Sequence, residues 1–259
     1  MHMGKIIGIV GGVGPYAGAD LVMKILSQTD STTDQGHLPL IMLSMPELIE
    51  DRTAFLSGKS KINPALAIAS IISRLEQAGA EIIGIPCNSV HAPEIFGVIL
   101  ETLRKINCRV RLVNMINEVA EFISCNYPDL VNIGVLASTG LYITEEYTRA
   151  LVSKGYNVIV PSIEIQNELV HKSIYDHSYG IKAHAYPPTE KARENLKQAI
   201  CHLQKNGAEA VVLGCTEMCL AIRERTVGKC IIFDSAMILA RALIKLSDPS
   251  KLKQWDKNG

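Results

Sequence analysis

The chain carries an internal repeat, and this feature limits its possible folds more than any other. The segments AGAEIIGIPCNS and NGAEAVVLGCTE share a Gly-Ala-Glu triplet followed by a cysteine, and the two cysteines, Cys87 and Cys215, lie 128 positions apart (215 − 87 = 128). A second matched pair, IGIVGGVG from Ile7 and IGVLASTG from Ile133, repeats at a shift of 126 (133 − 7 = 126). Two matched segments at nearly one shift indicate two copies of a single unit.

Short β-rich apolar runs alternate with longer runs of helical period, which is typical of βα units around parallel sheets. The sequence predicts an α/β fold of two pseudo-symmetric three-layer α/β/α lobes with mainly parallel sheets, and an active site in the cleft between them. Residues 1–115 plus 234–259 would form the first lobe and residues 116–233 the second. The predicted strands are Lys5–Val10, Leu38–Leu43, Glu81–Ile85, Val110–Val113, Asn132–Leu136, Asn157–Ile159, Ala210–Leu213 and Cys230–Phe233. The predicted helices are Ala17–Ser27, Pro64–Gln77, Pro93–Lys105, Ile116–Cys125, Glu145–Ser153, Thr189–Lys205, Met218–Arg225 and Ser235–Leu246.

Composition excludes several classes of partner. Lys plus Arg and Asp plus Glu both total 26, so the formal net charge is zero and no basic surface for nucleic acid is expected. No apolar run reaches membrane-spanning length, and no secretory leader is evident, so we expect no membrane partner. The seven cysteines are scattered without disulfide spacing, which favours a reducing, cytoplasmic setting.

Cys87 and Cys215 are the strongest candidates for chemistry. Most free cysteines are small buried hydrophobes, and Cys108, Cys125, Cys201 and Cys230 are interpreted in that way. Cys87 and Cys215 instead each follow an apolar strand and precede polar residues at an expected helix start. Backbone N–H groups and the positive end of a helix dipole favour a thiolate there. Ligands bind at the carboxyl ends of strands in open α/β sheets, so the two thiols would flank one ligand.

Two other interpretations compete for these segments. Cys87 with His91 and Cys215 with Cys219 lie one helical turn apart and could hold zinc, although the usual zinc knuckle is a tighter Cys-x-x-Cys, so no metal is predicted. His91 could also orient its neighbours or cap a helix. The loop GGVGPYAG fits G-x-G-x-x-A, but no acidic residue ends the following strand as a dinucleotide site requires. We interpret it as a tight turn whose backbone N–H groups bind a substrate carboxylate.

Five motifs together resemble the aspartate/glutamate racemases, a family of cofactor-independent amino-acid racemases, over nearly the whole chain. The two cysteine motifs, in this order and spacing, are the most specific of the five. The motifs are Gly11-Gly12-Val13-Gly14-Pro15, Asp51-Arg52-Thr53, Pro86-Cys87-Asn88-Ser89-Val90-His91, Ile181-Lys182-Ala183 and Gly214-Cys215-Thr216-Glu217.

The resemblance implies a role for each matching position. Cys87 and Cys215 would be the catalytic acid/bases, and Arg52 and Lys182 would hold the side-chain carboxylate of an acidic amino acid. Asn88, Ser89 and Thr216 would bind the α-carboxylate and amino group. Independently of the resemblance, the backbone at Gly12 and Gly14 is expected to bind a substrate carboxylate, and Ser138 and Thr139, in the matching loop of the repeat, could donate hydrogen bonds to it. Val13 replaces a family methionine in a loop expected to face the substrate, and Leu141 stands where the family has a hydroxyl. The resemblance further implies no cofactor and a homodimer.

The reaction implied is racemisation of aspartate or glutamate by two bases on opposite faces of Cα. One cysteine acts as a thiolate while the other waits as a thiol. Two alternatives stay open: a related superfamily isomerase or decarboxylase, and a non-catalytic amino-acid-binding protein on the same scaffold.

Overall fold

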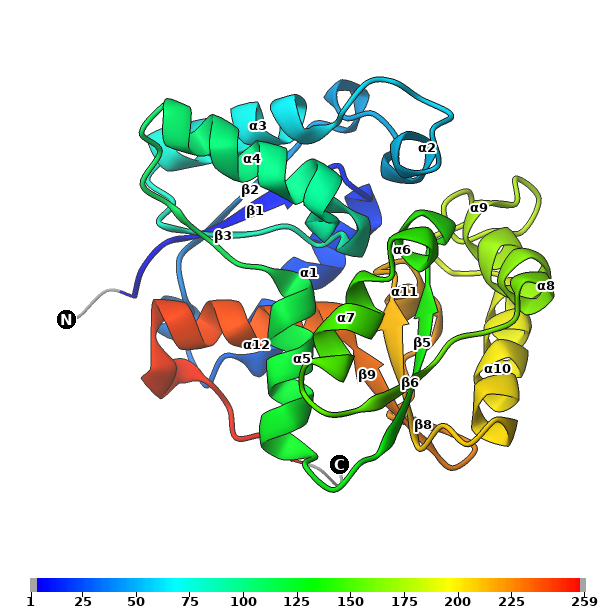
Figure 1. Cartoon of the computed structure of the whole chain (residues 1–259). Helices are drawn as coiled ribbons and strands as arrows, with labels where there is room; N and C mark the ends of the chain where they lie inside the picture. Colours follow the sequence, from blue (N-terminus) through cyan, green and yellow to red (C-terminus); the bar gives the residue numbers. More distant parts are fainter. Residues whose placement is uncertain (1–3, 257–259) are drawn as a thin grey trace.

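The computed structural model describes residues 4–256 and contains two mainly parallel sheets (Figure 1). The strand order is β2-β1-β3-β4 in the first sheet and β6-β5-β7-β9-β8 in the second, which confirms the predicted fold class. The first sheet comprises β1 (Ile7–Gly11), β2 (Leu40–Ser44), β3 (Ile82–Gly84) and β4 (Arg111–Leu112). The second comprises β5 (Asn132–Ala137), β6 (Asn157–Ile159), β7 (Ala210–Gly214), β8 (Thr226–Val227) and β9 (Cys230–Asp234).

The internal repeat is visible in both topology and register. Strands β1, β2, β3 and β4 correspond to β5, β6, β7 and β9, which stand in the same order. Ile7 pairs with Ile82 in the first sheet, and their repeat equivalents, Ile133 and Ala210, pair in the second. A one-residue slip would turn every side chain to the opposite face, so the shared register gives the two sheets matching inner and outer faces.

Helices cover both faces of the first sheet. Ile7 and Ile9 pack with α1 (Pro15–Gln28) and α12 (Ser235–Ser247), whereas Val10 packs with α3 (Ala65–Gln77) and α4 (Pro93–Lys105). This alternation is the period-two pattern of a strand buried on both sides. Helix α12 follows the last strand of the second sheet, yet it lies beside α1 under the first sheet (Figure 1). The predicted division of the chain into lobes at particular residues stays a prediction.

The second sheet is covered in the same way. Helices α5 (Met115–Asn126) and α7 (Glu146–Val152) cover one face, and α10 (Glu190–Lys205) covers the other. Thr189 begins α10 because its hydroxyl accepts a hydrogen bond from the Ala192 N–H. The remaining short helices are α2 (Arg52–Leu56), α6 (Thr139–Thr144), α8 (Ile163–Ile165), a π-helix (Gln166–His171), α9 (Lys172–Tyr175) and α11 (Met218–Ala221).

The structure corrects three local predictions. The helix predicted over Met218–Arg225 ends at Ala221, and the chain then forms β8, a two-residue antiparallel strand that the alternation of βα units gave no reason to expect. No predicted helix covers the stretch after the second strand, but Arg52 begins α2 there, where the Asp51 side chain accepts a hydrogen bond from the Ala54 N–H. The helical run over residues 163–175 was missed because a π-helix, Gln166–His171, interrupts its α-helical period.

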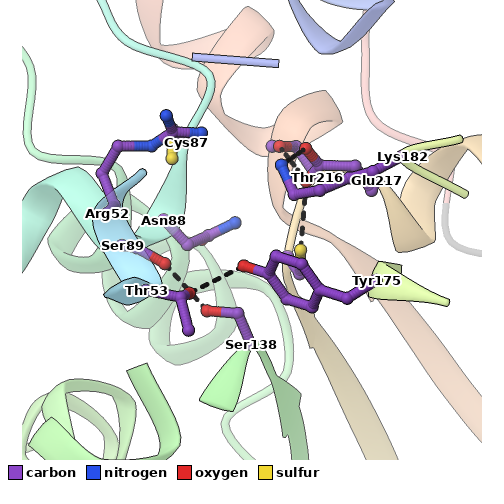
Figure 2. A pocket seen from close by; sticks show the side chains of 11 residues that line it. Arg52, Thr53, Cys87, Asn88, Ser89, Ser138, Tyr175, Lys182, Thr216 and Glu217 are labelled. Carbon is purple, nitrogen blue, oxygen red and sulfur yellow. Dashed lines mark hydrogen bonds and ion pairs between the residues drawn. The ribbon is translucent and has the colours of Figure 1, made fainter. Parts of the chain in front are cut away.

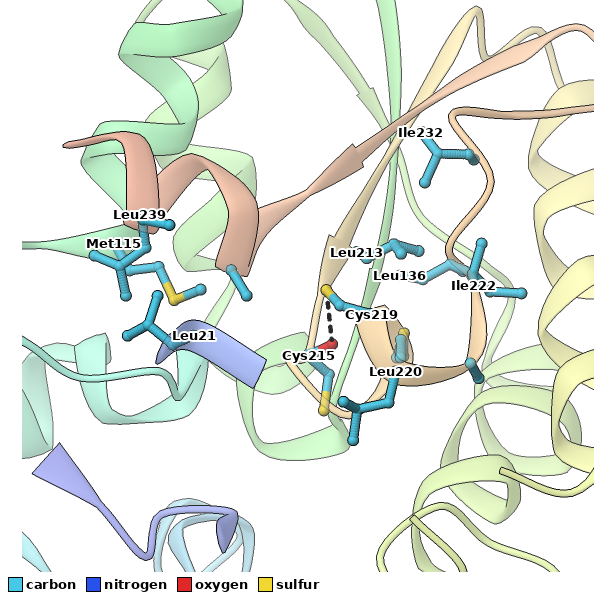
Figure 3. Packing of buried hydrophobic residues seen from close by; sticks show 14 of the residues in the cluster. Leu21, Met115, Leu136, Leu213, Cys215, Cys219, Leu220, Ile222, Ile232 and Leu239 are labelled. Carbon is cyan, nitrogen blue, oxygen red and sulfur yellow. Dashed lines mark hydrogen bonds between the residues drawn. The ribbon is translucent and has the colours of Figure 1, made fainter. Parts of the chain in front are cut away.

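A hydrophobic cluster joins the two halves of the molecule. It contains Leu21 and Leu239 beside the first sheet and Leu213 and Cys215 beside the second (Figure 3). Cys87 belongs to a separate cluster on the other face of the first sheet. Each thiol therefore lies at the edge of a packed core that fixes its position. Within residues 4–256, no helix has the length and apolar character needed to cross a membrane.

Candidate active site

Cys87 and Cys215 line one pocket, although they are 128 residues apart in the sequence (215 − 87 = 128). Cys87 follows β3 and Cys215 follows β7, which are equivalent strands of the two sheets. Their exposed fractions are only 7% and 6%. The pocket encloses at most about 270 Å³, below the usual ~300–1,000 Å³ of ligand pockets, so only a small molecule fits. Its lining residues are Arg52, Thr53, Cys87, Asn88, Ser89, Ser138, Tyr175, Lys182, Cys215, Thr216 and Glu217.

Arg52 supplies a buried positive charge on the Cys87 side of the pocket. Its guanidinium lies beside the Cys87 sulfur (Figure 2). One Nη donates to the Val13 carbonyl at 2.7 Å and the other to the Glu50 carbonyl at 3.2 Å, while the buried Nε has no partner. Burial opposes the charge, but the Cys87 thiol and two nearby carboxylates raise the pKa of Arg52 above its ordinary value. The free Nε–H is therefore a donor available to a ligand anion.

A carboxylate and an ammonium group occupy the Cys215 side. The Cys215 thiol donates to Glu217 Oε2 at 3.1 Å, and Lys182 Nζ lies 2.8 Å from Glu217 Oε1. Burial opposes ionisation of Glu217, but Lys182 outweighs it and lowers the pKa of this carboxyl to about 2. Burial raises the pKa of the Cys215 thiol well above its ordinary value, and Glu217 raises it further. The expectation that both thiols favour the thiolate is therefore wrong for Cys215.

Asn88 is held rigidly by a chain of hydrogen bonds. The Tyr147 hydroxyl donates to Asn88 Oδ1 at 2.6 Å, and Asn88 Nδ2 donates to Ser235 Oγ at 3.2 Å. Ser235 in turn donates to the Leu213 carbonyl at 2.7 Å. Because each donor has one acceptor, this series of hydrogen bonds fixes which end of the Asn88 amide carries the oxygen and which carries the nitrogen. Asn88 lines the pocket as predicted, and its amide is held by Tyr147 of α7 and Ser235 of α12.

Hydroxyl groups connect the two halves across the pocket. Ser89 Oγ and Ser138 Oγ lie 2.8 Å apart, and the Tyr175 hydroxyl donates to Thr53 Oγ1 at 2.7 Å (Figure 2). Thr216 Oγ1 donates to the Pro86 carbonyl at 3.0 Å. These bonds join residues of the first sheet's loops to residues of the second, so they hold the pocket closed in this conformation.

Three of the predicted substrate-binding residues do not line the pocket. Thr139 Oγ1 is hydrogen-bonded to His171 Nδ1 at 2.9 Å instead. Gly12, at φ 81°, lies against Met45 and Pro46, where a Cβ would come within 2.8 Å of the Pro46 nitrogen. Gly14, at φ 145°, lies against Glu217, and a Cβ there would come within 2.8 Å of Oε1. The glycine loop therefore does approach a carboxylate, but that carboxylate is the protein's own Glu217.

Other residues singled out from the sequence lie in the core. Val13 is fully buried and Leu141 is 2% exposed, and neither side chain lines the pocket. His91 lies 2% exposed, its Nε2 donates to the Ile85 carbonyl at 3.3 Å, and its ring packs on Phe96. Burial lowers the pKa of His91 to about 4, so this imidazole is neutral. Within residues 4–256, no three His, Cys, Asp or Glu side chains gather as a metal site would require.

Sequence reasoning missed four residues that shape this site. Thr53 and Glu217 stood inside the quoted motifs Asp-Arg-Thr and Gly-Cys-Thr-Glu, so their motif positions were an available signal. Tyr147 and Tyr175 come from helices that only the folded chain brings to the pocket. No local pattern in the sequence marks those two tyrosines.

Comparison with known proteins agrees with this geometry. The Asp/Glu/Hydantoin racemase family matches residues 10–243. The aspartate racemase of Picrophilus torridus shares 29% identity and a TM-score of 0.78, with 94% of each chain covered. An aspartate racemase homologue from Pyrococcus horikoshii OT3 shares 25% identity and a TM-score of 0.69, covering 94% of this chain and 99% of that one. A variant of arylmalonate decarboxylase, at 12% identity and a TM-score of 0.52, shares the fold alone, over 94% of this chain and 93% of the other.

The two sheets of one repeated unit, with a thiol from each in a common pocket, define a two-cysteine α/β scaffold of the racemase type. The chain belongs to the Asp/Glu/hydantoin racemase family, whose match spans residues 10–243.

Proposed function

We propose that the protein is a cofactor-independent racemase that interconverts the L and D forms of an acidic amino acid, aspartate or glutamate. The observation that supports this most is the pair of equivalent thiols, Cys87 and Cys215, at one small pocket beside Arg52. Two of the structural relatives described above are an aspartate racemase and an aspartate racemase homologue, which favours the same class of substrate.

Racemisation removes the Cα proton from one face of the substrate and returns a proton to the other face. Two acid/base groups on opposite sides achieve this without turning the substrate over. Cys87 and Cys215 come from equivalent strand ends of two repeated sheets, so a substrate bound between the sheets would have one thiol on each side. The thiolate of one cysteine takes the proton, and the thiol of the other donates one.

The charges in the pocket suit a substrate with carboxylates. Arg52 offers an unpartnered Nε–H and would bind the side-chain carboxylate. Lys182, whose side chain is 27% exposed, would assist it, although in this conformation its ammonium is paired with Glu217. The hydroxyls of Ser89, Ser138 and Thr216 lie near enough to the thiols to receive the α-carboxylate and amino group.

A Cα–H bond is a very weak acid, so the site must stabilise negative charge as it develops. Preorganised donors in a dry pocket do so without reorganisation during the reaction. The buried Asn88 amide and the hydroxyl pair of Ser89 and Ser138 are fixed by their own hydrogen bonds before a substrate arrives. We therefore assign them to positioning and charge stabilisation around Cα.

The proposal is tested by a chiral assay of D/L conversion over several amino acids, without added cofactor. We expect conversion of aspartate or glutamate, and its loss in both Cys87→Ser and Cys215→Ser. The matched control is Cys125→Ser, because Cys125 is exposed and does not line the pocket. Full activity in either pocket variant would contradict the two-base mechanism. Binding without solvent deuterium appearing at Cα would indicate a non-catalytic binding protein, and release of carbon dioxide would indicate a decarboxylase.

A further inference from the structure

The two pocket thiols have oppositely charged neighbours. The Arg52 guanidinium lies beside the Cys87 sulfur, so a negative charge on this sulfur would be paired (Figure 2). The Cys215 thiol instead donates its proton to Glu217 Oε2 over 3.1 Å. A negative charge on that sulfur would face a carboxylate at hydrogen-bonding distance. The chain repeat makes the two cysteines equivalent in position, but the charged groups beside them differ.

Glu217 is fixed as a carboxylate by its contacts. It lies 7% exposed, and its Oε1 is 2.8 Å from Lys182 Nζ. Gly14 leaves room for this oxygen, because a Cβ at that position would come within 2.8 Å of it. The shared ion pair keeps the charge of Glu217 compensated at Oε1 and leaves Oε2 free to accept from Cys215.

Groups on other elements act on Cys215 as well. Lys182 opposes the effect of Glu217, because a cation favours the thiolate. The thiol of Cys87 across the pocket and the burial of the site act in the same direction as Glu217. The titratable groups that face Cys215 are Glu217, Lys182, Cys87, Tyr147 and Tyr175. The nearest of them, by hydrogen bond, is the carboxylate of Glu217.

We propose that Glu217 is a positioning residue that holds the proton on Cys215, so Cys215 is the acid of the pair in the resting protein and Cys87, beside the Arg52 guanidinium, is the base. As a racemase, a role that rests on the function proposed above, the protein would then start on the enantiomer whose Cα–H faces Cys87. The Cys87 thiolate takes this proton, and the Cys215 thiol gives its proton to the opposite face. The resulting Cys215 thiolate lies beside Glu217 and is disfavoured, so a proton passes from Cys87 to Cys215 through water and restores the resting form.

The test is a thiolate titration that needs no substrate. Ultraviolet absorbance is followed against pH, and the spectrum of a matched Cys215→Ser protein is subtracted to isolate Cys215. We expect Glu217→Gln to lower the midpoint of Cys215 by about 1–3 pH units, which is typical for removal of a neighbouring charge. Glu224→Gln is the control, because Glu224 pairs with Arg193 and Lys197 but does not line the pocket.

A second variant has the opposite expected sign. Lys182→Met removes the cation that favours a Cys215 thiolate, so the midpoint of Cys215 should rise. This variant keeps the proposal testable if Glu217→Gln does not fold. An unchanged midpoint in folded Glu217→Gln, or a midpoint of Cys215 that does not rise in folded Lys182→Met, would overturn the proposal. If Glu217→Gln lowers the midpoint but the protein racemises nothing, the charge assignment is supported and the proposed racemase function is contradicted.

Discussion

Tyr147→Phe is the sharpest test of how the pocket is held together, because it removes one oxygen atom and leaves the ring in place. The lost hydroxyl donates to Asn88 Oδ1 at 2.6 Å, and the Tyr147 side chain is 2% exposed. The mutation leaves the oxygen of a buried amide without its donor. Such a loss costs about 1–3 kcal/mol of unfolding free energy.

The expected effect can be measured as a melting temperature. A loss of 1 kcal/mol lowers Tm by about 2–4 °C for a chain of this size, so we expect a decrease of about 4–8 °C for a loss of ~2 kcal/mol. Activity should fall as well, because Asn88 follows Cys87 directly and its amide would lose one of its two fixed contacts. The assays are calorimetry and the chiral conversion of aspartate or glutamate.

Tyr156→Phe serves as the control for this prediction. Tyr156 is also buried, at 5% exposed, but its hydroxyl donates to the Tyr127 carbonyl over 3.3 Å. A bond of this length contributes less, so we expect a loss below about 1 kcal/mol. Equal Tm values for the two variants, or a Tyr147→Phe protein as stable as the wild type, would refute the reasoning that the short bond to Asn88 stabilises the pocket.

Three further predictions follow from the same contacts. The folded pKa of Glu217, about 2, lies below its ordinary value, so the ionised Glu217 stabilises the fold above pH ~4.5 and this stabilisation is lost as the pH falls towards 2. In urea unfolding between these pH values, the free energy of unfolding should therefore decrease by up to about 3 kcal/mol less in Glu217→Gln than in the wild type. Burial holds the folded pKa of His91 at about 4, so the free energy of unfolding of the wild type should decrease as the pH falls from about 6.5 to 4. In the same urea unfolding series, His91→Gln should not show this decrease. Ser89→Ala and Ser138→Ala should show a coupling of about 1 kcal/mol in a double-mutant cycle, whereas additive effects would contradict the 2.8 Å contact.

The sequence was sufficient to predict the fold because the repeat is a global feature. The repeat by itself matches β1 with β5 and β3 with β7, and the same order and register appear in both sheets. The pairing of Cys87 and Cys215 in one pocket followed from that match, because equivalent strand ends face a common cleft. Arg52 and Lys182, which carried no local signal, were found through the family motifs alone and do line the pocket.

The remainder of the site could not be predicted from local patterns because it depends on contacts between distant segments. Tyr147 reaches Asn88 across 59 positions, and Tyr175 reaches Thr53 across 122. Thr139 was expected in the pocket from its loop position, but its hydroxyl is turned to His171. A sequence motif predicts the position of the backbone. The rotamer of each side chain depends in addition on the residues that pack against it in the folded chain.

The repeat also explains why the charge difference between the thiols was missed. A shift of 128 places Cys215 on Cys87 (215 − 87 = 128), and the same shift places Glu217 on Ser89. A symmetric interpretation treats these two positions as alike, but one holds a hydroxyl bonded to Ser138 and the other a carboxylate bonded to Cys215. Duplication supplies two similar bases, whereas a two-base reaction needs one of them protonated and the other not. The departure from symmetry two residues after each cysteine is therefore where the surroundings of the two thiols differ.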